Sequence, residues 1–219
     1  MEKIFSLALT ACAMFSFIYG LVRFFGKESP LYSKMIVFGI GCAMLGRLFE
    51  TLQFFTLGEL QGGFHVGMLG ILGSFLFFFA ANYGQMDALV DDKSVKFRKY
   101  RLIALLGPLT TAALFVISVL LSGVGKNTVY NTLLAFTVIN ASYFHLKHLI
   151  IPDVEGGIVR SIRAYNLMAL IYALLCMAEM ILWAVPGAFV FRVLVYSCLC
   201  VSFVVFIPVL ARGISKWSA

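Results

Sequence analysis

The chain has 219 residues, of which 62% are hydrophobic and 12% are charged, and its formal net charge at pH 7 is +7. Soluble domains carry about 25% charged residues, so this composition excludes an ordinary soluble protein and indicates an all-α, polytopic integral membrane protein. The basic residues lie between apolar segments and form no aromatic and basic platform outside them, which argues against a nucleic-acid partner.

Seven apolar segments are predicted to be transmembrane helices that together form a single membrane domain, residues 1–219. Each is about as long as the roughly 20 residues that a helix needs to cross the hydrocarbon core of a bilayer. Glycine, proline and asparagine residues mark most of the turns between them. In chain order the segments are residues 4–25, 35–57, 64–83, 102–121, 129–149, 164–185 and 188–211.

The third segment carries small residues along one face. Gly63, Gly67, Gly70 and Ser74 follow one another at steps of four, three and four, so they form a stripe on a helix. A stripe of small residues lets another backbone approach closely, and we predict helix packing there in preference to ligand contact. The polar residues 84–101 that follow are expected to form a solvated, charged connector.

The distribution of lysine and arginine predicts the orientation of the chain. One set of alternate connections, with the segment ends beside them, holds 13 of the 17 basic residues, and the opposite set holds only Lys3, Lys126 and Arg192. By the positive-inside rule, the amino terminus is outside and the carboxyl terminus is in the cytoplasm, in what we expect to be the plasma (inner) membrane. The 13 residues are Arg23, Lys27, Lys34, Lys93, Lys96, Arg98, Lys99, Arg101, Lys147, Arg160, Arg163, Arg212 and Lys216.

Charged residues lie inside two of the predicted spans. Arg47 and Glu50 are three residues apart in the second span, and Glu179 lies in the sixth. A charge at the centre of a spanning helix costs about 2.5–3.5 kcal/mol on insertion scales, so such groups face protein or water. Arg47 and Glu50 form either a structural ion pair or a ligand site. Glu179 is either neutral and hydrogen-bonded or paired with Arg47 across the bundle.

Further candidate ligand-binding residues lie on the same half of the predicted spans. Gln53 follows Glu50 by one turn, His65 begins the third span, and Arg192 begins the seventh. Tyr172 and Trp183 share the helix face of Glu179. A mixture of small and aromatic residues with polar groups suits a ligand pocket and suits ordinary helix packing about equally.

An internal repeat is the next hypothesis. A shift of 129 residues places Glu179 on Glu50, which is consistent with parallel halves 1–83 and 129–211 joined by a linker helix, 102–121, in a 3+1+3 arrangement.

This arrangement, with Lys34 followed by Arg47-Leu48-Phe49-Glu50, resembles the seven-helix family of SWEET sugar transporters, PQ-loop proteins and the KDEL receptor. The Pro-Gln dipeptide of most PQ-loop proteins does not occur in the sequence. The resemblance implies a seven-helix fold and a transport or receptor function.

Two functions are therefore predicted from the sequence. The first is a small-solute transporter, with membrane carboxylates around an outward-facing polar cavity that are coupled to protons or another ion. The second is a sensor or receptor module that binds a ligand in the same cavity. None of the common hydrolase, metalloprotease or phosphate-loop motifs occurs, so we expect no enzyme, metal or cofactor, although an intramembrane enzyme stays an alternative. The expected partners are the lipid bilayer and a small molecule, and a homo-oligomer is left open.

Overall fold

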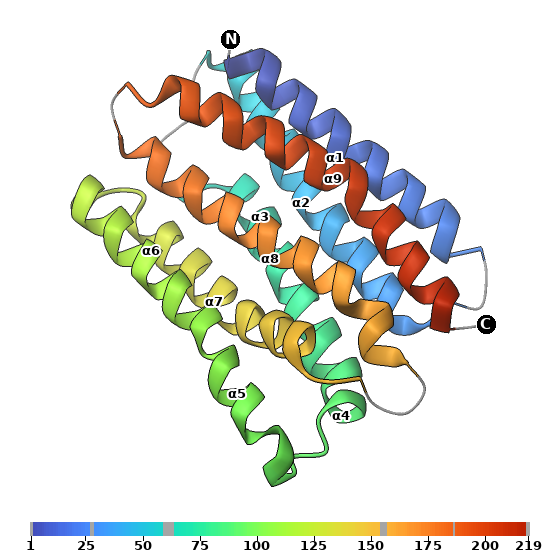
Figure 1. The fold of residues 1–219 in the computed structure, drawn as a ribbon. Helices are drawn as coiled ribbons and strands as arrows, with labels where there is room; N and C mark the ends of the chain where they lie inside the picture. Colours follow the sequence, from blue (N-terminus) through green and yellow to red (C-terminus); the bar gives the residue numbers. More distant parts are fainter. Residues whose placement is uncertain (1, 27–28, 59–63, 154–156, 186, 218–219) are drawn as a thin grey trace.

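The protein is a bundle of long helices (Figure 1). The computed structural model describes residues 2–26, 29–58, 64–153, 157–185 and 187–217. Every regular element within these ranges is helical. The elements are α1 (Glu2–Phe24), α2 (Leu31–Thr56), α3 (Val66–Ala80), a π-helical turn (Ala81–Met86), α4 (Asp87–Val90), a 3₁₀ turn (Val95–Phe97), α5 (Arg98–Ala104), α6 (Leu106–Ser122), α7 (Thr128–Ile150), α8 (Ile158–Trp183) and α9 (Phe189–Trp217).

The long helices run side by side along one direction. Helices α1, α2 and α9 lie on one side of the bundle in Figure 1, α6 and α7 lie on the other, and α3 and α8 lie between them. Within the described ranges, six helical stretches are long and apolar enough to cross a membrane: Lys3–Phe24, Leu31–Thr56, Val66–Val90, Val95–Ser122, Val159–Trp183 and Phe189–Ser215. The prediction of an all-α protein with several membrane spans is thus confirmed.

Helix α7 covers the fifth predicted span but is not one of these six apolar stretches. Its polar side chains point into the bundle: Asn131, His145, Lys147 and His148 are all buried. A helix whose polar groups face its neighbours does not have to be uniformly apolar to lie within a membrane protein. The seven-span topology and its orientation stay predictions.

The expected solvated connector over residues 84–101 is correct only in part. Helical structure continues from α3 through the π-helical turn and α4 to Val90, and it resumes at Val95. Met86 and Val90 are buried against the bundle, and Asp91 is only 3% exposed, because it pairs with side chains of the protein. The other charged residues of the segment are mostly exposed, as expected: Asp92, Lys93, Lys96, Arg98 and Lys99.

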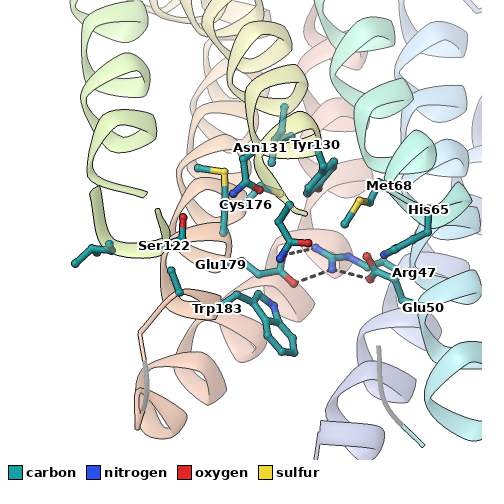
Figure 2. A pocket seen from close by; sticks show the side chains of 15 residues that line it. Arg47, Glu50, His65, Met68, Ser122, Tyr130, Asn131, Cys176, Glu179 and Trp183 are labelled. Carbon is teal, nitrogen blue, oxygen red and sulfur yellow. Dashed lines mark hydrogen bonds and ion pairs between the residues drawn. The ribbon is translucent and has the colours of Figure 1, made fainter. Parts of the chain in front are cut away.

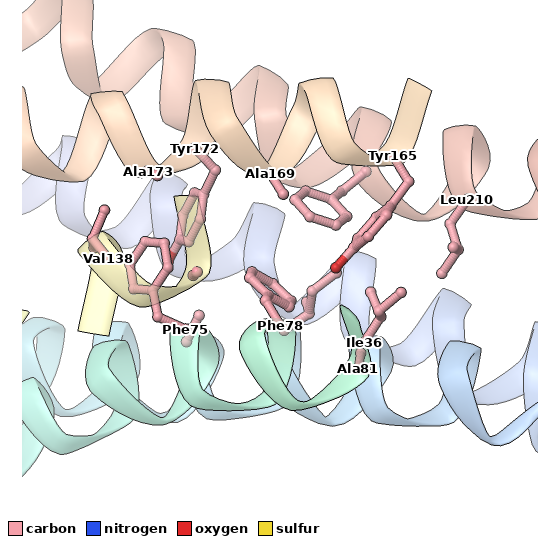
Figure 3. Close-up of a cluster of buried hydrophobic side chains, with 14 of the residues drawn as sticks. Ile36, Phe75, Phe78, Ala81, Val138, Tyr165, Ala169, Tyr172, Ala173 and Leu210 are labelled. Atoms are coloured by element: carbon pink, nitrogen blue, oxygen red, sulfur yellow. The ribbon is translucent and has the colours of Figure 1, made fainter. Parts of the chain in front are cut away.

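An aromatic core fills the middle of the bundle (Figure 3). The Phe75 ring of α3 stacks on the Tyr172 ring of α8, with ring centroids 5.2 Å apart. The Phe78 ring stacks on the Phe206 ring of α9, with centroids 5.3 Å apart. The Tyr165 ring meets the Phe78 ring edge-on, with centroids 6.5 Å apart. Offset-stacked and edge-to-face pairs add about 0.5–1.5 kcal/mol each beyond the area they bury, so this core joins three helices firmly.

Helices α2 and α3 approach most closely at glycines. A Cβ added to Gly70 would lie 2.6 Å from the backbone of Gly46 and would also clash with the carbonyl of Cys42. A Cβ on Gly67 would lie 3.0 Å from the Gly46 carbonyl oxygen. Helix packing is therefore confirmed for Gly67 and Gly70, whereas Gly63 lies outside the described residues.

We predict that Gly70→Ala lowers the free energy of unfolding by about 1–3 kcal/mol, because the added methyl group forces two backbones apart. Thermal unfolding of the purified protein in detergent measures the effect. Gly84→Ala is the matched control, since nothing lies within 4 Å of a Cβ at that position. Equal melting temperatures for the two variants would contradict the proposed close packing.

Candidate functional site

A pocket of about 430 Å³ lies at one end of the bundle (Figure 2). Its walls come from the last turns of α2, α6 and α8 and from the first turns of α3 and α7, which meet at this end because neighbouring helices alternate in direction. The lining residues are Arg47, Glu50, His65, Met68, Leu121, Ser122, Asn127, Tyr130, Asn131, Leu134, Cys176, Glu179, Met180, Trp183 and Ala184.

Three charged side chains form a triad on the pocket wall. The Arg47 guanidinium donates two hydrogen bonds to Glu179, from Nη1 to Oε1 at 2.8 Å and from Nη2 to Oε2 at 2.5 Å. Its Nη1 also donates to Glu50 Oε2 at 2.9 Å. The side chains are 5%, 13% and 13% exposed for Arg47, Glu50 and Glu179. Of the two alternatives for Glu179, the structure shows the pair with Arg47 across the bundle.

The triad is asymmetric. Both oxygens of Glu179 accept from Arg47, whereas Glu50 accepts through Oε2 alone. Within the described ranges, Glu50 Oε1 accepts no further hydrogen bond, and Arg47 Nε has no partner. One cation thus faces two carboxylates, and the triad has a formal charge of −1 when all three groups are ionised.

Aromatic, amide and thioether side chains form the rest of the lining. Tyr130 and Trp183 approach the triad from different helices, and Met68 and Met180 add flexible apolar surface (Figure 2). Asn131 is only 8% exposed, and its side chain makes no hydrogen bond to any residue that the structure describes. Small-molecule sites typically combine apolar and aromatic walls with convergent polar groups, and this lining contains both kinds of side chain.

Five of the eight residues predicted as ligand-binding lie together in the lining: Arg47, Glu50, His65, Glu179 and Trp183. The other three lie elsewhere. Gln53 is buried one turn beyond Glu50 and outside the lining, and Tyr172 belongs to the aromatic core. The Arg192 guanidinium lies over the Trp183 ring, 5.3 Å from its centroid, and does not line the pocket.

Sequence reasoning missed the contribution of α6 and α7 to the pocket. Leu134 lies about one turn after both Tyr130 and Asn131, so all three lie on one side of the helix. The unusual polarity of residues 129–149 was the available signal, and it indicated that this helix faces protein or water. It did not indicate which of its polar residues meet Arg47.

A buried polar cluster lies at the opposite end of the same helices. Asn82 of the π-helical turn donates to Asn166 Oδ1 at 3.1 Å, and its amide nitrogen lies 2.6 Å from His145 Nδ1. His148 lies 3.3 Å from Asn82 Oδ1 and 3.2 Å from Asp87 Oδ1. These contacts join α3, α4, α7 and α8 at that end.

Ion pairs extend this cluster toward the surface. The Lys147 ammonium contacts Asp87 and lies 3.1 Å from Asp91, and Arg101 of α5 lies 2.9 Å from the other oxygen of Asp91. Burial alone would raise the pKa of Asp91, but hydrogen bonds from Lys147, the Lys93 backbone N–H and Arg101 outweigh it and hold the pKa below its ordinary value of 3.8. Asp91 is therefore ionised at neutral pH and fixes the end of α4 against α5 and α7.

The chain matches no protein-family model, no curated protein and no solved structure. The function is consequently argued from the pocket, the triad and the polar cluster. Among the described residues, no group of three or more His, Cys, Asp and Glu side chains is arranged to hold a metal ion.

We predict that Arg47→Gln lowers the free energy of unfolding by about 3–5 kcal/mol, because it leaves two buried carboxylates together without a cation. Adding Glu179→Gln should recover part of the loss, since one carboxylate then remains. Thermal unfolding in detergent compares the variants. Arg98→Gln, on an exposed residue of α5, is the control for the same substitution. Wild-type stability of the Arg47 variant would contradict the role given to the triad.

We also predict a pH dependence for the polar cluster. The lowered pKa of Asp91 means that its contribution is complete above the unfolded-state value, 3.8, and is lost as the pH falls through the folded-state pKa. Asp91→Asn should therefore melt at a lower temperature than the wild type at pH 7, and the difference should shrink as the pH falls below 3.8. Melting curves between neutral and acidic pH measure this.

The neighbouring Asp92→Asn is the matched control for the pH experiment. Asp92 is more than half exposed and pairs with Lys96 on the surface, so its removal should change the melting temperature little at neutral pH. If the difference between Asp91→Asn and the wild type stayed constant from neutral to acidic pH, the ion pairs of Asp91 would not be the stabilising interaction.

Proposed function

We propose that the protein is a small-solute membrane transporter whose binding site is the pocket around Arg47, Glu50 and Glu179. The observation that carries the proposal is the order of layers along the helices. Along α8, Cys176 and Glu179 line the pocket, Tyr172 and Tyr165 belong to the aromatic core, and Asn166 lies in the polar cluster. Along α3 and the π-helical turn, Met68 lines the pocket, Phe75 and Phe78 belong to the aromatic core, and Asn82 lies in the polar cluster.

This order supports a site that is open at one end and closed at the other. From Cys176 to Asn166 the rise along α8 is about 15 Å, at 1.5 Å per residue. Over that distance the aromatic core and then the buried ion pairs close the bundle. Alternating access needs such a closure, which reopens on the far side while the pocket closes.

Several predictions from the sequence become parts of this proposal. The excess of lysine and arginine at the closed end supports a cytoplasmic position for that end and an outside position for the pocket, with seven spans and an outside amino terminus in the plasma membrane. The halves 1–83 and 129–211 contribute Arg47 and Glu179, which pair with each other. The repeat, and the resemblance to the SWEET and PQ-loop family, accord with rocking of one half against the other.

A sensor or receptor module is the second candidate. The pocket lies at one end of the bundle only, and the polar cluster closes the other end. A ligand that binds in a pocket without an exit would act by changing the packing of the helices and not by crossing the membrane. The two candidates therefore differ in whether the pocket is ever reached from the cytoplasmic side.

We predict that Leu134→Cys, in a cysteine-free background with wild-type stability, reacts with a membrane-impermeant thiol reagent from both sides of the membrane. Leu134 lines the pocket and is 1% exposed, so the reagent reaches it only through an access path. Right-side-out and inverted vesicles measure the two rates. Reaction should be faster from the outside, because the structure is open at that end.

Leu133→Cys is the control. Leu133 directly precedes Leu134 on α7, is 41% exposed and does not line the pocket. On the proposed lipid-facing surface, the charged reagent should react with it slowly from either side. Reaction of Leu134→Cys from the outside only would reject transport and favour the sensor. Reaction from neither side would reject the pocket as an accessible site.

A further inference from the structure

We infer that the pocket selects an organic cation, a small molecule with an ammonium group on an apolar or aromatic body, in preference to an anion or a neutral solute. The inference deepens the proposed function by naming the chemical class of the solute, and it rests on the pocket being a binding site. Transport itself is not needed for it, because a sensor could use the same selectivity.

The charges of the triad are the first argument. Arg47 uses three of its hydrogen bonds on its own carboxylates, including both oxygens of Glu179. An anionic ligand would have to share this cation with two carboxylates already in contact with it. A cation instead meets Glu50, whose Oε1 accepts no hydrogen bond from the described residues. At low dielectric the charge that lacks a counterion decides which ligand is favoured.

Other charged groups near this end do not reverse that balance. Arg192 is outside the lining and lies over the Trp183 ring, and Lys126 is an exposed residue of the α6–α7 turn. Lys3 is exposed on α1, over the ring of Phe55. The two lysines are surface charges, which water and salt screen far more than they screen the buried triad, whereas Arg192 is half-buried.

The aromatic and methionine side chains of the pocket walls are the second argument for a cationic ligand. Tyr130 and Trp183 are aromatic residues on different helices beside the triad (Figure 2). An ammonium group over the face of such a ring gains about 0.5–2 kcal/mol. Tyr130 offers such a face, whereas the Arg192 guanidinium already lies over the Trp183 ring. The two methionines give the apolar body a surface of adaptable shape. Carboxylate and aromatic groups together favour an alkyl- or arylammonium over a bare metal ion, for which no cluster of ligands is present among the described residues.

The amide of Asn131 is the third argument, and it is independent of charge. Asn131 is 8% exposed as a whole residue and lines the pocket, and its side chain makes no hydrogen bond to the residues described. Its amide is therefore available to a ligand in the pocket, as the few convergent polar groups of small-molecule sites are. The Asn131 carbonyl oxygen can accept from an ammonium N–H.

Three matched probes test the inference: tryptamine, a cation at pH 7, tryptophol, its neutral analogue, and indole-3-acetate, an anion. Isothermal titration of the purified full chain in detergent measures their affinities. We expect tryptamine to bind at least about tenfold more tightly than tryptophol, and indole-3-acetate to bind most weakly. Glu50→Gln should remove the advantage of tryptamine and leave tryptophol unchanged. Asp92→Asn, which removes one negative charge at the other end, should change neither affinity.

A second measurement does not depend on the choice of probe. The Leu134→Cys variant is treated with a trimethylammonium and with a sulfonate methanethiosulfonate reagent, and both rates are divided by those for 2-mercaptoethanol. We expect the normalised cation-to-anion ratio to be about tenfold above one, and to fall toward one in the Glu50→Gln background.

The outcomes separate this inference from the proposed function. Tighter binding of indole-3-acetate, or a normalised ratio at or below one, would overturn cation selectivity even if Leu134→Cys is labelled from both sides. A tryptamine affinity that survives Glu50→Gln would likewise overturn it. Cation selectivity with labelling from the outside only would keep this inference and reject transport.

Discussion

The pairing of Arg47 with Glu179 is the interaction on which the rest of the site depends. A guanidinium inside a membrane bundle is unfavourable unless carboxylates surround it, and here one comes from its own helix and one from α8. The pair therefore fixes how α2 and α8 are rotated about their axes. That rotation directs Trp183 of α8 toward the space that Tyr130 and Asn131 of α7 also line.

Elsewhere the bundle follows the same constraint, because lipid offers no partners to a polar group. Ser6 and Thr10 of α1 each bond to Thr51 of α2, at 2.7 and 2.8 Å. Helix α7 contributes polar side chains at both of its ends. Its first turns line the pocket, and its last turns supply Lys147 and His148 to the polar cluster. The low apolarity of α7 is thus explained by its position between two polar regions.

Much of the fold could be predicted from the sequence because lipid exposure demands long apolar segments, and all seven predicted segments are largely helical, although the fourth spans α5 and α6 and the third runs into the π-helical turn. The exact ends of the helices were harder to predict from the sequence. Residues 158–163 and 212–217 continue α8 and α9 beyond the predicted bounds, since arginine, serine and lysine are as compatible with a helix end as with a loop.

For the site, the charged residues within spans were found because a buried charge stands out against an apolar sequence. Glu50 and Glu179 lie 129 positions apart, and their superposition in the predicted repeat did not show that both bind Arg47. The buried role of Asp87, Asp91 and Lys147 could not be predicted, because a run of mixed charges is usually solvated and nothing local shows that Lys147 turns inward. Asn131 lacked any local signal that would distinguish it from Asn140, which bonds to its own helix backbone.

The π-helical turn Ala81–Met86 has a mechanical consequence. A π turn contains about one residue more than an α turn, so its conversion to an α turn would rotate the following residues by about 100° about the helix axis. Such a rotation would carry Asp87 away from Lys147 and His148 without breaking the chain's helical character. Under the proposed transport function, a change of winding in one helix would suffice to open the closed end, without unfolding of the bundle.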